Sequence, residues 1–401
     1  MNDIYPVTIG YNTISSFRTT SANNISHNFF GIRTGYNTNA SRGSFTIRNN
    51  TIGNNVLHSI SMGTATTTVQ NYVCGIHNTG EGFMSIRNNT VQGLSAFGLF
   101  PAESEVCGIQ FQGRNNNTDI LRNYLHTFYV NSDDYNSSVT GISMGEGSVT
   151  FANNIIRIGA EVTTRSYVTG IYRAGGGAGT QILNVFFNSV YLNGIVTSGG
   201  GAPSTSDCIF LDDRSGSDIR VSMINNIFYN ARSCPNPQAL IPTNNAIKIN
   251  DLTNPISSWL TSNYNDCFFT DIKSGAIGTI GGNLPYANLA LWQAATNLDA
   301  NSLSLDPLFT INPPISTSGF IPAENLPGLT GVGGITTDYD QDIRCLPTMG
   351  AQESFLPVTV QFNPDYFCQM SGRWCCHLYS YRIEFKRYYL HSGSDTCSRN
   401  Y

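Results

Sequence analysis

The sequence predicts an all-β protein: a right-handed parallel β-helix solenoid with a short helix and an irregular cap region near its C-terminus. Two segment types recur in a fixed order, and apolar residues recur at regular positions within them. Only 12% of the 401 residues are charged, about half the usual share. Ile, Val and Phe are placed regularly among many Asn, Gly, Ser and Thr residues, which is not typical of a disordered chain.

The first segment type combines a short apolar run with an Asn pair. It reads FTIRNNTI at Phe45–Ile52, MSIRNNTV at Met84–Val91, VTFANNII at Val149–Ile156 and VSMINNIF at Val221–Phe228, with weaker copies at Ile120–Leu125 and Val185–Leu192. Intervals of 39, 34, 31, 34 and 38 residues separate the anchors Asn50, Asn89, Asn123, Asn154, Asn188 and Asn226. Such a unit fits one solenoid coil with a variable loop.

The second segment type follows the first in each unit. It reads VCGI at Val73–Ile76 and Val106–Ile109, VTGI at Val139–Ile142 and Val168–Ile171, and DCIF at Asp207–Phe210, with FFGI at Phe29–Ile32 as a further copy. Counting by twos predicts that Cys74, Ile76 and Asn78 face inward, as do their equivalents in later copies. We therefore expect one buried ladder formed by Ile76, Ile109, Ile142, Ile171 and Ile209.

The Asn pairs have a structural explanation. A coil bends sharply between strands, and Asn tolerates positive φ better than most residues. Stacked Asn amides can also hydrogen-bond from coil to coil. A β-propeller is the alternative fold, but its blades need four strands per repeat, and the sequence offers two clear strand segments.

The chain divides into three predicted regions: coils over 1–280, a cap or terminal β-helix region over 281–355, and an atypical tail over 356–401. The segment Ala287–Asn297 is the best helix candidate. The tail is rich in Cys and Tyr, and we interpret it as a truncated or out-of-frame end. A zinc site at Cys368, Cys375, Cys376 and His377 is the alternative for this tail.

The region from Leu289 to Glu353 resembles the terminal part of bacterial exported right-handed β-helix proteins of the pectate-lyase-like superfamily. The resemblance rests on LALWQAAT, DANS, DPLF, DYDQDIR and GAQE, in that order. It implies export and makes Asp338–Arg344 a structural turn in which Arg344 pairs locally. Families of this type often have Gly where this chain has Gln341. The resemblance says little about activity, because the superfamily holds lyases, hydrolases and adhesins.

Composition narrows the partners and the location. The chain has no basic stripe, which argues against nucleic acid, and no apolar run long enough to span a membrane. The N-terminus lacks the features of a signal peptide. We nevertheless expect a secreted or cell-surface protein, with its signal peptide missing from this chain.

Two sets of residues are candidates for function. The outward positions that follow the core Ile residues predict ligand binding, through polar and aromatic side chains suited to sugars: His77, Gln110, Tyr172 and Phe210. His77 is expected on an exposed strand face. The candidate catalytic groups are the cluster Asp212, Asp213 and Arg214, just after the fifth copy of the second segment type, and Arg173, one coil earlier. We assign no metal or other cofactor, and calcium at Asp338, Asp340 and Asp342 is the alternative.

Three functions fit these patterns. A non-catalytic adhesion or glycan-binding module is favoured, because few charged groups are available for acid–base catalysis. A polysaccharide lyase or glycoside hydrolase is the second hypothesis. A purely structural spacer is the third.

Overall fold

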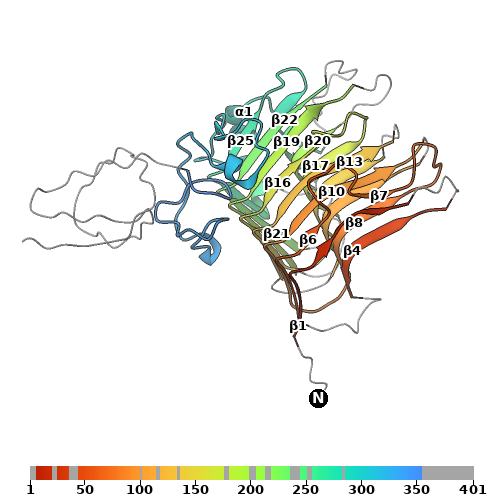
Figure 1. Cartoon of the computed structure of the whole chain (residues 1–401). Coiled ribbons are helices and arrows are strands. Elements are labelled where there is room, and N and C mark those ends of the chain that lie inside the picture. The colour runs from red at the N-terminus through yellow and green to blue at the C-terminus, as the bar shows by residue number, and fades with distance from the viewer. Residues whose placement is uncertain are drawn as a thin grey trace, which may run out of the picture.

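The computed structural model shows an all-β parallel solenoid, as the sequence predicts. Three sheets, here called A, B and C, run along the solenoid, and equivalent strands of neighbouring coils pair in parallel (Figure 1). The structure describes residues 6–19, 25–35, 44–99, 102–113, 118–132, 136–175, 180–197, 205–212, 218–234, 244–250, 255–281 and 285–354.

The elements follow one another in the same order in successive coils. Sheet A contains β1 (Val7–Gly10), β5 (Phe45–Arg48), β9 (Met84–Arg87), β12 (Thr118–Leu121), β15 (Val149–Ala152), β18 (Thr180–Phe186), β21 (Asp218–Ile224) and β24 (Leu260–Asn263). Sheet B contains β2 (Thr13–Ile14), β3 (Phe17–Arg18), β6 (Thr51–Ile52), β7 (Ile60–Met62), β10 (Thr90–Phe97), β13 (Tyr124–Asn131), β16 (Ile155–Ile158), β19 (Ser189–Ile195), β22 (Ile227–Ser233) and β25 (Asp266–Phe269). Sheet C contains β4 (Asn28–Thr34), β8 (Tyr72–Asn78), β11 (Glu105–Phe111), β14 (Ser138–Met144), β17 (Tyr167–Arg173), β20 (Ser206–Leu211), β23 (Asn244–Ile249) and β26 (Gly275–Ile280).

An Asn-containing bend joins sheet A to sheet B, and its two residues have different tasks. The first residue adopts positive φ, as Asn49 does at 54° and Asn225 at 62°. The second residue stacks: the backbone N–H and Nδ2 of Asn154 both donate to Oδ1 of Asn188, at 3.0 and 2.9 Å. The same pattern links Asn12, Asn50, Asn89, Asn123, Asn154, Asn188, Asn226 and Asn265. The predicted Asn stack at a bend is confirmed.

The apolar core fills the inside of the solenoid. The expected Ile ladder is confirmed, because all five side chains have 0% exposure: Ile76, Ile109, Ile142, Ile171 and Ile209. They belong to one continuous cluster that also takes in the inward side chains of sheets A and B. Neighbouring coils therefore bury one another's apolar faces, as a solenoid requires.

The strict alternation expected in sheet C is wrong at one point. A Cβ on Gly75 would lie 2.4 Å from Cγ1 of Val91, so Gly75 faces inward, and Ile76 next to it is also part of the core. Cys74 therefore lies on the outer face rather than the inner one, together with its row partner Cys107. The alternation breaks because sheet C approaches sheet B too closely for a side chain at the glycine position.

Helix α1 (Leu289–Thr296) confirms the predicted short helix and covers the C-terminal end of the solenoid (Figure 1). Asn288 caps its N-terminus by accepting a hydrogen bond from the Leu291 N–H, at 3.0 Å. Trp292 is fully buried and joins the main core cluster. Three short 3-10 turns lie outside the sheets: η1 (Ile256–Ser258), η2 (Thr317–Phe320) and η3 (Val332–Gly334).

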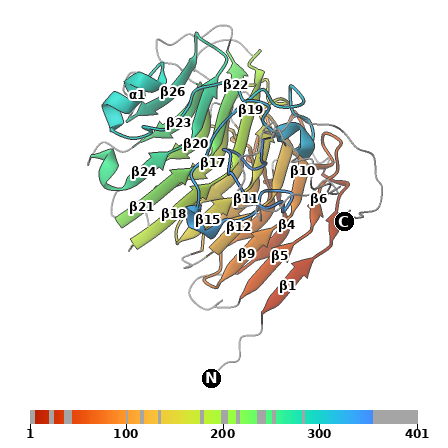
Figure 2. The same ribbon diagram turned by 90° about the vertical axis from the view of Figure 1, so that its left-hand side faces the viewer.

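The chain after α1 does more than cap the end. Residues 303–354, here called the C-terminal segment, fold back along the outer face of sheet B (Figures 1 and 2). Phe309, Phe320 and Met349 of this segment bury side chains of sheet B, among them Tyr191 and Tyr229. None of the helices in the described ranges is both long and apolar enough to cross a membrane.

Candidate functional site

The outward side chains of sheet C form a continuous line across the coils. Strand register places them in the order Arg33, His77, Gln110, Ser143, Tyr172, Phe210, Lys248 and Thr279, here called the outer row. Successive members lie on adjacent strands, about 4.8 Å apart in the hydrogen-bonding direction. The four residues predicted to bind a ligand are thus in one row, as their spacing in the sequence suggests.

Two aromatic residues stand together in the outer row. The ring centroids of Tyr172 and Phe210 are 5.3 Å apart with an interplanar angle of 44°, and both side chains are half-buried. Nζ of Lys248 lies over the Phe210 ring, 4.4 Å from its centroid. The row therefore offers an apolar surface next to a cation.

Polar groups surround this aromatic pair. The Tyr172 hydroxyl donates to Oδ2 of Asp212 at 2.9 Å, and Nδ2 of Asn250 donates to Oδ1 at the same distance. Burial and the hydrogen bond to Asp212 raise the pKa of Tyr172. On the other side, Nζ of Lys248 is 3.4 Å from Oδ2 of the buried Asp207. Burial raises the pKa of Asp207, although Lys248 opposes this shift.

The other end of the outer row is packed more tightly. His77 is only 6% exposed, so the expectation of an exposed His77 is wrong. The Phe30 ring stacks against it, with centroids 4.9 Å apart, and its Nε2 is 3.3 Å from Oε1 of Gln112. Burial lowers the pKa of His77. Gln110 is half-buried, and its Oε1 accepts a hydrogen bond of 2.6 Å from the Tyr72 hydroxyl.

The two catalytic candidates that the structure describes, Arg173 and Asp212, do not form one group. Arg173 faces into the solenoid with 0% exposure, in a row between Met144 and Leu211. Its Nη2 donates to Oε1 of Gln181 at 2.7 Å. Asp212 lies on the outer side, half-buried beside Tyr172. An enclosed guanidinium cannot reach a ligand on the outer face, so Arg173 and Asp212 do not share an accessible site.

Two of the four catalytic candidates, Asp213 and Arg214, lie outside the described residues. The tail over 356–401, with the alternative zinc ligands, also lies outside them. Within the described ranges, no group of three His, Cys, Asp or Glu side chains is placed to hold a metal ion.

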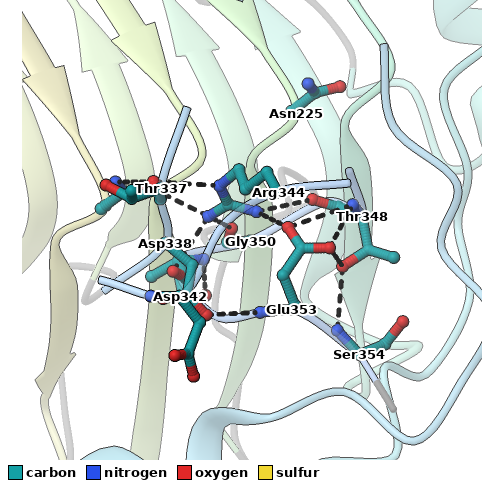
Figure 3. Close-up of polar contacts among 12 residues, drawn as sticks. Asn225, Thr337, Asp338, Asp342, Arg344, Thr348, Gly350, Glu353 and Ser354 are labelled. Atoms are coloured by element: carbon teal, nitrogen blue, oxygen red, sulfur yellow. Dashed lines mark hydrogen bonds and ion pairs between the residues drawn. The ribbon is translucent and has the colours of Figure 1, made fainter. Parts of the chain in front are cut away.

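The Asp338–Arg344 turn is a structural clamp (Figure 3). Nη2 of Arg344 donates to the carbonyl oxygens of Gly350 and Ala351, at 2.9 and 3.0 Å, and to Oδ1 of Asn153 at 2.9 Å. Its Nη1 pairs with Glu353. Its guanidinium also lies 4.0 Å from the centroid of the Phe187 ring. The local pairing of Arg344 implied by the resemblance is present, and the same side chain fastens the C-terminal segment to the solenoid.

The carboxylates of this turn serve its backbone. Oδ1 of Asp338 accepts the Asp342 N–H at 2.9 Å, and Oδ2 accepts the Glu353 N–H at 3.3 Å. Oδ2 of Asp340 accepts a hydrogen bond from Nε2 of Gln352 at 2.6 Å. Oxygens of Asp338 and Asp340 are thus engaged in hydrogen bonds within the turn, whereas a calcium site would use several such oxygens converging on one point.

The structure also contains a groove that sequence reasoning missed. It has a volume of about 560 Å³, lies on the outer face of sheet B and ends against the C-terminal segment at Asn312 and Pro313. Polar groups line it together with Tyr191, Ile195 and Ile272: Asn193, Ser233, Thr270, Asp271 and Lys273. No motif in the sequence identifies this groove, because its walls come from strands and turns that are distant along the chain.

Comparisons with protein-family models, with curated proteins and with solved structures found no match for this chain.

Proposed function

We propose that this protein is a non-catalytic glycan-binding module, exported to the cell surface or beyond, that binds an extended polysaccharide along the outer row of sheet C. The Tyr172–Phe210 pair is the observation that carries the proposal. Aromatic rings present large, rigid apolar faces with polar edges. A sugar ring has an apolar face and a rim of hydroxyls, so the pair and the polar groups beside it fit both parts.

The row geometry favours a polymer over a small molecule. The outer row repeats side chains on adjacent strands, and repeat arrays offer long surfaces for extended partners. Contacts spread along such a surface are individually weak and add up with chain length. The bacterial origin and the pectate-lyase-like kinship suggested by the sequence are compatible with this proposal.

Binding of the full chain to a panel of neutral and acidic polysaccharides, by affinity electrophoresis, tests the proposal. We expect wild-type protein to be retarded by at least one polymer. The double variant Tyr172→Ala, Phe210→Ala should bind roughly tenfold more weakly or worse, which corresponds to a loss of about 1.4 kcal/mol or more.

The matched control is a second aromatic pair on another face. Phe97 and Tyr129 of sheet B are also half-buried, with ring centroids 5.5 Å apart, and their double Ala variant should bind like wild type. If wild-type protein binds no polymer in the panel, the proposal fails. Equal losses in both double variants would show that the effect comes from stability rather than from the site.

A polysaccharide-active enzyme is the second candidate, and Asp212 is the group that favours it. This carboxylate stands beside the aromatic pair and accepts hydrogen bonds from Tyr172 and Asn250. Release of unsaturated or shortened sugars by wild-type protein, but not by Asp212→Asn, would favour the enzyme over the binding module. A spacer without ligand is the third candidate, and it predicts neither binding nor product release.

A further inference from the structure

A buried carboxyl group lies at the contact between sheet B and the C-terminal segment. Asp266 is on β25, with 0% exposure. Register places it next to Ile227 in the outward row of sheet B, and Ile227 belongs to the same buried apolar cluster as Phe309 and Leu326 of the segment. Asp266 is therefore covered by the C-terminal segment and not by the solenoid core.

The first residues of the segment are bonded directly around Asp266. Its Oδ1 accepts a hydrogen bond of 3.0 Å from the Leu305 N–H. The neighbouring Leu303 N–H donates to the Asn265 carbonyl at 2.7 Å, and the Leu303 carbonyl accepts from the Cys267 N–H at 2.9 Å. These bonds attach residues 303–305 to β25 through an isolated parallel bridge between Asp266 and Leu303.

The second oxygen of this carboxyl group is not satisfied. Oδ2 of Asp266 is buried and has no hydrogen-bond partner among the described residues. A buried polar atom without a partner is unfavourable, and a buried charge without one is far more so. The site therefore accommodates the neutral acid much better than the carboxylate.

The charged groups around Asp266 act in the same direction. Asp306 and Glu324, both on the C-terminal segment, disfavour a further negative charge at Asp266. Tyr229 on β22 and Cys267 on β25 are its other titratable neighbours. Burial, followed by these two carboxylates, raises the pKa of Asp266 to about 7, although the Leu305 N–H lowers it.

We propose that Asp266 is a pH-dependent latch, which holds the C-terminal segment against sheet B in acid and loosens it as the pH rises toward neutrality. In the closed state the neutral carboxyl group accepts the Leu305 N–H without meeting the charges of Asp306 and Glu324. Ionisation adds a third negative charge to those of Asp306 and Glu324. Opening relieves this repulsion by exposing Asp266 to water.

The direction of the pH effect follows from linkage. The closed state binds the proton up to a pKa of about 7, whereas an exposed Asp loses it near about 4. Between these two values the closed state holds more protons than the open state, so closing becomes less favourable as the pH rises. Above about pH 7 both states are ionised, and the effect levels off.

Loosening of the segment would change the surface of sheet B. Phe309 and Phe320 cover Tyr191, and Phe309 also covers Tyr229. Asn312 and Pro313 form one wall of the 560 Å³ groove. The latch would therefore control access to the Tyr191 and Tyr229 rings and to this groove. This effect is independent of ligand binding on sheet C.

Hydrogen–deuterium exchange of the full chain across about pH 4.5–8.5 tests the latch, after division by the intrinsic exchange rate at each pH. In wild-type protein, protection of residues 303–308 should fall up to about tenfold per pH unit until about pH 7 and then level off. Asp266→Asn keeps the acceptor for Leu305 but cannot ionise, so its protection should not change with pH in this way. The amides that pair β12 with β15 serve as an internal reference.

Two further variants sharpen the test. Asp342→Asn removes an exposed carboxylate of the same segment and should follow the wild-type profile. Asp306→Asn removes one facing charge and should move the levelling-off to lower pH. A wild-type profile that is flat across the range would overturn the proposal, even if Asp266→Asn does not fold. The same pH dependence in wild type and in folded Asp266→Asn would overturn it equally.

Discussion

The indole Nε1 of Trp292 donates a hydrogen bond of 2.8 Å to Oδ2 of Asp299, and both side chains are buried at the end of the solenoid. Oδ1 of the same carboxylate accepts from the hydroxyls of Ser262 and Ser302, at 2.7 Å each. Oγ of Ser302 in turn accepts the backbone N–H of Asn265, the last Asn of the stack, at 2.9 Å. The Asp299 carboxylate therefore connects helix α1, through Trp292, to the end of the Asn stack, through Ser302.

Replacing Trp292 with Phe should destabilise the protein by about 1–3 kcal/mol, because Oδ2 of Asp299 loses its buried donor while most of the apolar contact remains. Chemical denaturation measures the effect as a lower midpoint with an unchanged slope. Leu291 on the exposed side of the same helix is the control, and Leu291→Ala should change stability by less than about 0.5 kcal/mol. Similar effects of both substitutions would contradict the assigned role of the indole N–H.

Removing one Asn from the middle of the stack should be costly. In Asn154→Ala the Asn123 amide loses its acceptor and the Ile120 carbonyl loses its donor, both buried, so we expect a loss of roughly 3 kcal/mol. Asn12 occupies the exposed N-terminal end of the same stack. Asn12→Ala should cost less than about 1 kcal/mol in the same denaturation experiment. Equal costs at the two positions would show that stacking adds nothing beyond local bend geometry.

Neighbouring strands of sheet C carry glycine at equivalent positions, as Gly75 and Gly108 do. We expect a side chain at these positions to clash with sheet B. A Cβ at Gly75 would lie 2.4 Å from Cγ1 of Val91 and 2.6 Å from the Gly108 carbonyl oxygen, so Gly75→Ala should cost about 1–3 kcal/mol through overpacking. At Gly145 the nearest atom to a new Cβ is 3.6 Å away, and Gly145→Ala should be close to neutral or slightly stabilising. Thermal unfolding of the two variants checks this, and a neutral Gly75→Ala would show that sheets B and C can move apart.

Arg344→Lys should release the middle of the C-terminal segment. A lysine cannot reproduce the planar fork that binds Asn153, Gly350 and Ala351 together, and a buried acceptor that loses its donor typically costs about 1–3 kcal/mol. Faster hydrogen exchange at the Met349 and Gly350 amides should reveal the release. Arg48 is exposed, and Arg48→Lys should leave exchange in this segment unchanged. Unchanged exchange in Arg344→Lys would mean that apolar packing alone seats the segment.

The sequence predicts the fold well because each coil repeats the same structural signals. Recurring Asn pairs identified the bend, and recurring Ile residues identified the core. The side of sheet C on which Cys74 lies could not be predicted, because it depends on how closely sheet C approaches sheet B at Gly75. Phe187 and Tyr264 stand where other coils have the first Asn of the pair, yet both adopt positive φ, since the neighbouring coil stacked against them dictates the bend.

The candidate site was predicted only in part. Strand register follows from the repeat, so the outer row could be placed in order. The burial of His77 could not be foreseen, because Phe30 covers it from the preceding coil. The position of the C-terminal segment was equally hidden: its hydrogen bonds to the bends between sheets A and B join residues more than a hundred positions apart, and no local pattern records them.

The C-terminal segment is hydrogen-bonded to the solenoid at two separate bends, and this fixes the spacing between them. Nδ2 of Asn153 donates to the Thr337 carbonyl at 2.8 Å, and Asn225 pairs in the same way with the backbone of Leu329, at 2.8 Å for each bond. These Asn residues belong to bends two coils apart, and a fixed length of chain connects their partners. Coils added or deleted near the N-terminal end would therefore leave both sets of hydrogen bonds in place. Between Asn153 and Asn225 the number of coils is locked, because any change would separate the segment from one of its anchors.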